Sequence, residues 1–268
     1  MKHEEFFRKH PVFTSKEMAG YLSSCGVSHP RNSEILLAYH KKRGRLISVR
    51  RGLYAVVPPG TNPVSYSVDP FLIAAKLTKD AVLSHHTALE FHGYAYSVHE
   101  NFIYSASSPL SPVVFRTHVF HGVRFSEPLR RTNKENFGVV TVDRSGMEVC
   151  VTSLERTMVD ILNRPDLSGG WEEVWRSLES VEFFDLDEVI KYTLLLKNAT
   201  AAARVGFFLK QHRKPLMVEE KHLRPLYSAR PRQPHYLDRN NHGSNRFVSE
   251  WNLVVPLEII EQTWKEVI

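Results

Sequence analysis

The sequence predicts an α+β protein in two parts, a small N-terminal module and a larger body. Two observations predict this architecture: a hairpin signal follows amphipathic helices within the first sixty residues, and helical and β-branched segments alternate over the rest. The 268 residues, 42% of them hydrophobic, suffice for a core in each part. We expect the larger part to be mixed α+β, with helices, a mostly antiparallel sheet and a helical C-terminal part.

The module is predicted to contain three helices, the first over residues 4–9. Thr14 is the expected N-cap of the second, because Glu17 stands three residues later and completes a capping box. Asn32 is the expected cap of the third helix, which Gly44 ends. The apolar residues of this third helix recur at helical spacing, at Ile35, Leu36 and Tyr39.

Two runs rich in β-branched residues, 45–49 and 53–57, flank the sequence Arg50-Arg51-Gly52. A glycine between two such runs is typical of a hairpin. Helix, helix, turn, helix and hairpin in this order is the plan of a winged helix-turn-helix, and we predict that fold for residues 1–60.

Basic residues concentrate in this module. Residues 1–60 hold 11 Lys and Arg against 4 Asp and Glu, whereas residues 61–208 hold 14 against 18. A cationic module favours a polyanionic partner, because cations that neutralise phosphates release counterions. A basic surface that serves only solubility is the alternative.

The predicted fold gives the polar residues of the module two roles. Residues at the start of the third helix are expected at base edges in the major groove, where arginine suits guanine and asparagine suits adenine: Arg31, Asn32 and Ser33. Cations at the end of that helix and on the hairpin are expected at phosphates: Lys41, Lys42, Arg43, Arg45, Arg50 and Arg51. Favourable interaction with the helix dipole is the alternative for the cluster at the helix end.

The proline-rich connection at residues 58–68 separates the module from a body over residues 69–268. Asp69-Pro70 begins a helix, and Ser84 begins a short one that Gly93 ends. Strands are expected at residues 102–104, 113–120, 139–142 and 148–151. Further helices are expected from a capping box at Thr152 and Glu155, from Trp171, and over residues 186–197 and 199–212.

Four segments together resemble the AbiEi-type antitoxins of type IV toxin-antitoxin systems. They are VRRGLYAVVP at 49–58, LSHHTALEFHGY at 83–94, TSLERTMVDILNRPDLSGG at 152–170 and WNLVVP at 251–256. The resemblance implies a repressor that binds double-stranded operator DNA, as a monomer or a homodimer, and controls its own operon. It also implies a larger domain that counteracts a nucleotidyltransferase toxin in phage defence.

The helix at 152–163 is a candidate surface for that partner, through Glu155, Arg156 and Asp160. Alternatively, Arg156 and Asp160 stand four residues apart and can pair on the exposed face of this helix. We expect no catalytic residue and no enzyme activity.

Two other functions stay open. A metal-dependent DNA nuclease would use Glu219 and Lys221 with Asp185 or Asp187, although the segment before Glu219 is predicted to be helical and not to converge these groups. A winged-helix regulator with a ligand-sensing body and no toxin is the other alternative.

No cofactor and no metal are expected. The fourteen histidines, among them His85, His86, His92, His118 and His121, show no ligand spacing such as H-E-x-x-H, and the two cysteines stand far apart. The sequence has no run of 18 apolar residues and no apolar leader, which predicts a cytoplasmic protein without a membrane partner.

Residues 209–246 are again basic, with 9 Lys and Arg against 3 Asp and Glu. Aromatic residues lie between the cations, as in surfaces that bind single-stranded nucleic acid. An ordered arm packed on an acidic part of the body and a disordered loop are equally open.

Overall fold

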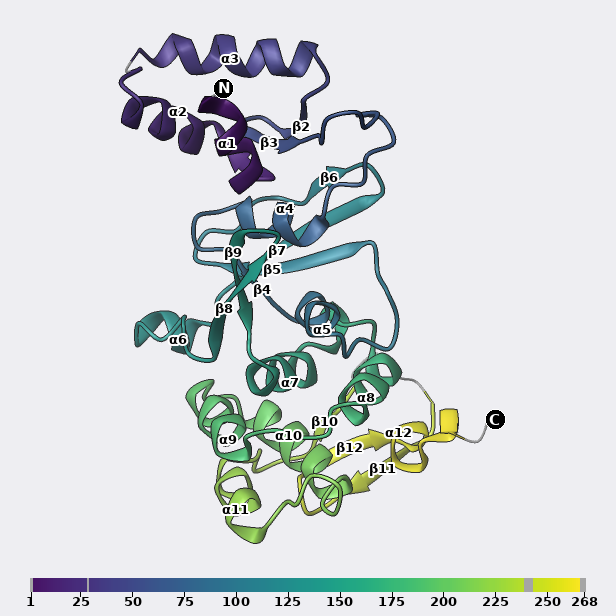
Figure 1. Ribbon diagram of the computed structural model, residues 1–268. Coiled ribbons are helices and arrows are strands. Elements are labelled where there is room, and N and C mark those ends of the chain that lie inside the picture. Colours follow the sequence, from purple (N-terminus) through teal and green to yellow (C-terminus); the bar gives the residue numbers. More distant parts are fainter. Residues whose placement is uncertain (1, 28, 239–242, 266–268) are drawn as a thin grey trace. The chain divides into compact units, whose positions relative to one another are not determined.

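The computed structural model describes residues 2–27, 29–238 and 243–265 (Figure 1). Helices and three sheets make up the chain, which confirms the predicted α+β class. No helix in the described ranges is both long enough and apolar enough to cross a bilayer.

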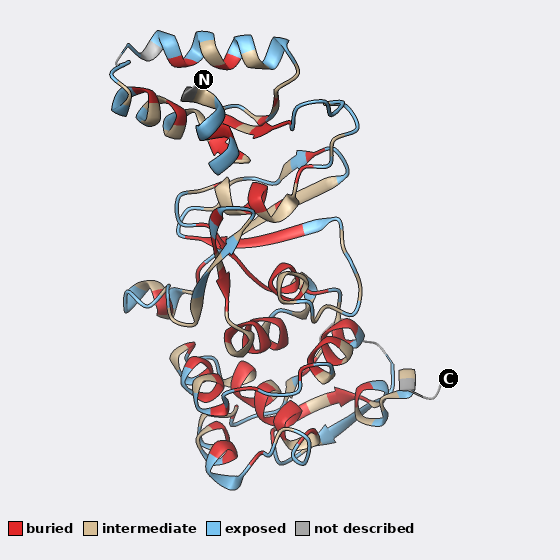
Figure 2. Cartoon of the chain, viewed as in Figure 1, coloured by how far each residue is buried: buried red, intermediate tan, exposed pale blue. Residues whose placement is uncertain are grey.

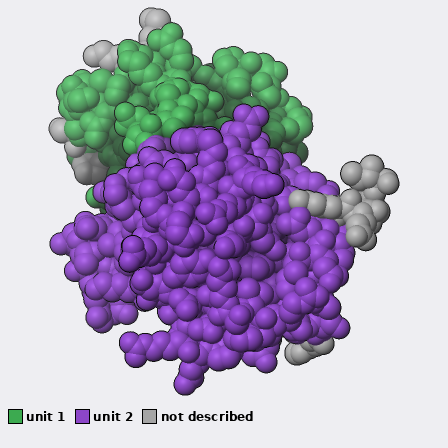
Figure 3. Space-filling model, turned by 90° about the horizontal axis from the view of Figure 1, so that it is seen from below, with its two compact units in different colours: residues 1–83, 100–124, 141–151 green, residues 84–99, 125–140, 152–268 purple. Residues whose placement is uncertain are grey.

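The chain divides into two compact units, which Figure 3 colours separately. Unit 1 comprises residues 1–83, 100–124 and 141–151, and unit 2 comprises residues 84–99, 125–140 and 152–268. This division differs from the expected parts at 1–60 and 69–268, because unit 1 also holds most of a six-stranded sheet that we had expected to belong to the body.

The N-terminal part of unit 1 consists of α1 (Lys2–Lys9), β1 (Val12–Thr14), α2 (Ser15–Ser24), α3 (Pro30–Lys42), β2 (Leu46–Arg50) and β3 (Leu53–Val56). β3 lies between β1 and β2 and is antiparallel to both. These elements share a hydrophobic core of their own, built from Phe6, Phe7, Phe13, Met18, Leu22, Leu37, Leu46 and Val56.

The capping box at the start of α2 is confirmed: the Thr14 hydroxyl accepts from the Glu17 amide, and the Glu17 carboxylate accepts from the Thr14 amide. The expected cap of α3 is wrong. His29 caps this helix through its side chain, and Asn32 lies inside the first turn, because Pro30 takes the first helical position.

The six-stranded sheet has the order β6-β7-β5-β4-β9-β8. Its strands are β4 (Val82–Leu83), β5 (Asn101–Ala106), β6 (Val113–Phe115), β7 (His118–Arg124), β8 (Val139–Arg144) and β9 (Met147–Thr152). Strands β5 and β7 run parallel, as do β4 and β9, whereas β6 and β7, and β4 and β5, are antiparallel, so the sheet is mixed. The expected strand at 113–120 is two strands, because Arg116 adopts a φ of 55° and turns the chain.

Helix α4 (Pro70–Lys76) also belongs to unit 1, and the Asp69 side chain caps it as predicted. Unit 2 is largely helical, with α5 (His86–His92), α6 (Glu127–Arg131), α7 (Leu154–Asn163), η1 (Pro165–Leu167), α8 (Trp171–Glu179), α9 (Leu186–Leu195), α10 (Ala199–Gln211), α11 (Glu220–Ala229), α12 (Leu257–Glu261) and η2 (Thr263–Lys265). A small sheet of β10 (His235–Tyr236), β11 (Asn245–Val248) and β12 (Leu253–Pro256) completes it.

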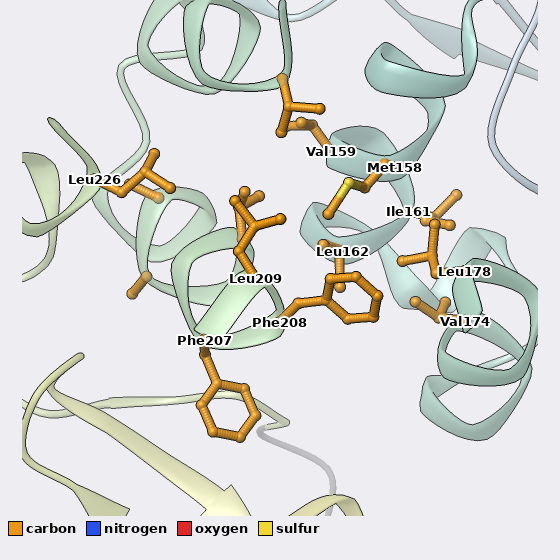
Figure 4. Packing of buried hydrophobic residues seen from close by; sticks show 14 of the residues in the cluster. Met158, Val159, Ile161, Leu162, Val174, Leu178, Phe207, Phe208, Leu209 and Leu226 are labelled. Atoms are coloured by element: carbon orange, nitrogen blue, oxygen red, sulfur yellow. The ribbon is translucent and has the colours of Figure 1, made fainter. Parts of the chain in front are cut away.

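The core of unit 2 forms where α7, α8, α10 and α11 meet (Figure 4). Met158, Leu162 and Phe208 lie at its centre with no exposed surface. The expected capping box at Thr152 is wrong, because Ser153 caps α7 and accepts from the Arg156 amide at 3.4 Å.

The basic segment 209–246 is an ordered part of unit 2 over its described residues. Leu223 and Leu226 of α11, with Leu237, are fully buried in the core. Apolar packing therefore holds this segment in place. One alternative from the sequence was that it packs on an acidic part of the body. Residues 239–242 lie outside the described ranges.

Candidate nucleic-acid interface

The face of α3 that points away from its core carries exposed residues at helical spacing. Arg31, Ile35, Ala38 and Lys42 form one stripe, and Asn32 and Tyr39 lie beside it. Ile35 is 60% exposed and Tyr39 is 48% exposed, whereas Leu37 on the opposite face is 4% exposed. Figure 2 shows this exposure along the helix. Such a face, with polar, cationic and apolar groups together, matches the mixed chemistry of base edges, including the thymine methyl group.

The apolar periodicity of α3 predicted a helix correctly, but two of its three residues point to solvent. Ile35 and Tyr39 are therefore candidate contact residues that the sequence did not single out. Only the burial of Leu37 and Ser33 identifies which side of α3 is the inner one.

The end of α3 is strongly cationic. Lys41, Lys42 and Arg43 are all exposed, and the Arg43 guanidinium lies 4.8 Å from the centroid of the Tyr39 ring. The three expected phosphate contacts at this end thus present their charge to solvent.

A groove of about 470 Å³ lies between α2, α3 and the β2–β3 turn. Lys16, Lys41 and Arg51 line it from these three elements, with Glu34 as the acidic residue among its lining. The structure thus brings the predicted residues Lys41 and Arg51 to one groove and adds Lys16, which no sequence pattern indicated as a DNA contact.

Strand pairing places Lys16 next to the hairpin turn. Thr14 stands opposite Leu53 in the β1–β3 register, and the Ser15 amide donates to the Gly52 carbonyl at 2.9 Å. The pairing of a three-residue strand with the hairpin is a long-range event that the sequence pattern did not show.

Two predicted contact residues face inward. Ser33 is 8% exposed, and it lines the groove between α2 and α3 and does not belong to the outer, exposed stripe of α3. The Arg45 side chain donates to the Val57 carbonyl and to the Glu4 carboxylate, and it is only 19% exposed. Arg45 therefore stabilises the N-terminal fold, and its assignment to phosphate contact is corrected.

The candidate partner surface on α7 is also corrected. Arg156 is 2% exposed and Asp160 is 8% exposed. The Arg156 guanidinium donates to the carbonyls of Glu135 and Phe137 at 2.6 Å and lies 3.4 Å from the Asp160 carboxylate. The pair of Arg156 and Asp160 is therefore buried, and the expectation that it lies on the exposed face of the helix is wrong.

Two further contacts complete this part of unit 2. The Tyr192 hydroxyl donates to Asp160 at 2.7 Å, and Glu155 accepts from the Asp185 amide at 3.3 Å. The group Glu155, Arg156 and Asp160 thus joins α7 to α9 and to the loop before β8, and it holds unit 2 together.

A buried polar cluster in unit 2 surrounds His86. Its two ring nitrogens lie 3.0 Å from Glu90 and 3.2 Å from Glu173. Burial raises the pKa of Glu173, but hydrogen bonds from Ser97, Ser177 and His86 outweigh it and hold that pKa below its ordinary value. Burial lowers the pKa of the nearby His99.

His86, His99 and Glu173 each offer a ligand atom, and these atoms lie within 4.8 Å of one another. The two imidazole rings, however, stack in parallel, 3.7 Å apart with 6° between their planes. A metal ion binds a ring nitrogen in the plane of the ring, at about 2.0 Å. Two stacked rings cannot both direct a lone pair at one ion, so this cluster is arranged as a hydrogen-bond network.

The residues of the nuclease alternative do not converge on one point. Asp185 caps α9 by accepting from the Glu188 amide at 3.1 Å, and Glu219 begins α11, where Lys221 pairs with it at 3.2 Å. Within the described ranges, these carboxylates form no group with metal-ligand spacing.

The comparisons with known proteins give a fold and no family. No family model matches the sequence, and no curated protein matches it. The crystal structure of the RV2827C protein from Mycobacterium tuberculosis is similar to this chain, with a TM-score of 0.59 and 16% sequence identity. The alignment covers 98% of this chain and 94% of that protein. This similarity concerns the fold.

Proposed function

We propose that residues 1–60 form a winged helix-turn-helix that binds double-stranded operator DNA, and that the protein is an autoregulating repressor and antitoxin. One observation carries the DNA-binding part: the exposed face of α3 adjoins a groove in which cations from α2, α3 and the hairpin turn meet. This arrangement offers base-edge contacts and phosphate contacts from neighbouring elements.

In this proposal α3 enters the major groove, with Arg31, Asn32 and Ile35 at the base edges. Lys16, Lys41 and Arg51 contact phosphates on either side. Operator repeats are read by two copies of the chain, each on one half-site.

The salt dependence of DNA binding tests this assignment. Removing one cation that neutralises a phosphate reduces the slope of log K against log salt by about 0.9, so Lys16→Ala with Arg51→Ala is expected to reduce it by about two. The matched control removes two exposed cations of unit 2, Lys214→Ala with Arg232→Ala, and leaves the slope unchanged. Equal slopes for the two double variants would refute the proposed interface.

The antitoxin part of the proposal rests on the resemblance to AbiEi-type antitoxins. The partner is a nucleotidyltransferase toxin encoded beside this protein, and the cytoplasm is the place of action because both DNA and toxin are there. Unit 2 has an ordered helical core of its own. This core supports the proposal that the body counteracts the toxin without the DNA-binding module.

Coexpression separates the two activities. The full chain is expected to rescue growth of cells that express the neighbouring nucleotidyltransferase, and Lys16→Ala with Arg51→Ala is expected to rescue equally well while it loses repression. Growth arrest in the presence of the wild-type chain would reject the antitoxin function.

A further inference from the structure

Unit 1 contains a second and larger pocket, of about 1040 Å³, which shares Ser15, Lys16, Arg51 and Gly52 with the groove described above. The start of α2, the β2–β3 turn, the end of α4 with the residues after it, and β9 contribute its walls. Its volume is that of a site for an organic molecule, because sites for small ligands and cofactors measure about 300–1,000 Å³.

The rim of this pocket is cationic. Lys16, Arg50, Arg51 and Lys79 line it, and none of these side chains forms an ion pair within the described part of the chain. Lys76 also lines the pocket, but Glu17 neutralises it at 2.5 Å. Since Glu148 is the remaining acidic residue among the lining, the pocket carries a clear excess of positive charge.

The floor of the pocket is aliphatic. Leu53, Ala75, Leu77 and Ala81 supply it, and the lining residues include no aromatic ring. A nucleobase is recognised mainly by stacking on aromatic side chains, so this floor suits an aliphatic chain better than a base. A cationic rim and an aliphatic floor together favour an anion that has an apolar, non-aromatic body.

We propose that this pocket binds a small organic anion with an aliphatic body, a carboxylate or a phosphate ester, and that the bound anion weakens DNA binding. The second half of this inference rests on the proposed function. Arg51 lines both this pocket and the groove assigned to phosphate contact, so an anion that engages Arg51 here withdraws its charge from the DNA backbone. The pocket thereby makes the hairpin turn responsive to a metabolite.

Calorimetry with three probes tests the ligand class. Octanoate carries charge and chain, 1-octanol carries the chain alone, and acetate carries the charge alone. We expect octanoate to bind at one site per chain, at least about tenfold more tightly than either control, because a hydrogen bond to a charged group and several buried methylenes both contribute. Equal binding of octanoate and 1-octanol would overturn the proposal.

Two variants place the ligand in this pocket. Ala75→Phe fills the aliphatic floor and is expected to abolish octanoate binding, while Lys79→Met removes one rim cation and is expected to weaken it about tenfold. Lys134→Met, at an exposed lysine of unit 2, is the control and leaves the affinity unchanged. Octanoate binding that survives both pocket variants would place the ligand elsewhere and refute the site.

DNA binding in the presence of octanoate tests the coupling. The apparent Kd for operator DNA is expected to rise as octanoate fills the site, and Ala75→Phe is expected to remove this effect while it still binds DNA. A protein that binds octanoate but no DNA would reject the proposed function and leave the pocket assignment standing. DNA affinity that is independent of octanoate would reject the coupling alone.

Discussion

Glu17 and Lys76 stand 59 positions apart in the sequence and form an ion pair, with 2.5 Å between the carboxylate oxygen Oε1 and Nζ. The other carboxylate oxygen of Glu17 accepts from the Thr14 amide at 2.6 Å and closes the capping box of α2. One side chain thus begins α2 and ties it to α4. Burial raises the pKa of Glu17, but hydrogen bonds from Lys76 and Thr14 outweigh it and hold that pKa below its ordinary value.

This pKa predicts how stability changes in acid. The folded state favours the ionised form of Glu17. The contribution of Glu17 to the free energy of unfolding is therefore complete above the unfolded-state pKa of about 4.3, and it is lost as the pH falls through the lower folded-state pKa. Glu17→Gln is expected to reduce the free energy of unfolding by about 1 kcal/mol at pH 7 and to flatten its decline below about pH 4.3. Urea denaturation from pH 7 to pH 3 measures both. Lys76→Met keeps the capping box, so it is expected to reduce the free energy of unfolding by less than Glu17→Gln does. An equal reduction would show that the capping contact of Glu17 with Thr14 adds nothing beyond its ion pair with Lys76.

Arg156→Met is expected to destabilise unit 2 by about 3–5 kcal/mol, because it leaves the buried Asp160 carboxylate without its cation and two carbonyls without their donor. Urea denaturation measures this loss, and Arg131→Met is the control, since Arg131 is 75% exposed in its ion pair. A variant at Arg156 that keeps its stability but no longer neutralises the toxin would restore the partner-contact interpretation.

Ile35→Ala is expected to change sequence preference without a loss of stability, because this side chain is 60% exposed. If Ile35 packs on thymine methyl groups, the wild type binds an operator with uracil in place of thymine about fourfold more weakly, at about 0.8 kcal/mol for one buried methyl group. The alanine variant then no longer distinguishes the two operators. Fluorescence anisotropy with paired operators measures this, and an unchanged discrimination would exclude Ile35 from base contact.

Local signals in the sequence predicted much of the fold. The capping box of Thr14 and Glu17, the Asp69 cap and the glycine that ends α5 depend on contacts within a few residues, and each is present. The cap of α3 also depends on local contacts, but its prediction at Asn32 was wrong. Pro30 occupies the first helical position, so the cap is His29.

Tertiary placement accounts for the errors at the candidate site. Periodicity shows that α3 has two faces, but only the packing of the N-terminal core, which includes Leu37, decides that Leu37 is inside and Ile35 outside. The i, i+4 spacing of Arg156 and Asp160 suits an exposed pair and a buried pair equally. Lys16 lies at the candidate site because β1 pairs with β3, and no local sequence pattern predicts this long-range pairing.

Gly206 in α10 offers a test in which local propensity and packing predict opposite signs. A glycine to alanine change inside a helix stabilises it by up to about 1 kcal/mol when space allows. At Gly206, however, a Cβ atom would overlap Cη2 and Cζ3 of the fully buried Trp251 and lie 2.8 Å from its Cε3. We therefore expect Gly206→Ala to destabilise unit 2 by about 1–3 kcal/mol.

The matched control for this change is Gly20→Ala in α2, where a Cβ atom meets nothing within 4 Å. It is expected to raise the free energy of unfolding by about 0.5–1 kcal/mol, because only helix propensity acts there. Urea denaturation of the two variants compares the signs directly. If Gly206→Ala stabilised the protein as Gly20→Ala does, the indole of Trp251 could not lie against α10, and the packing that joins the β11–β12 turn to this helix would have to be different.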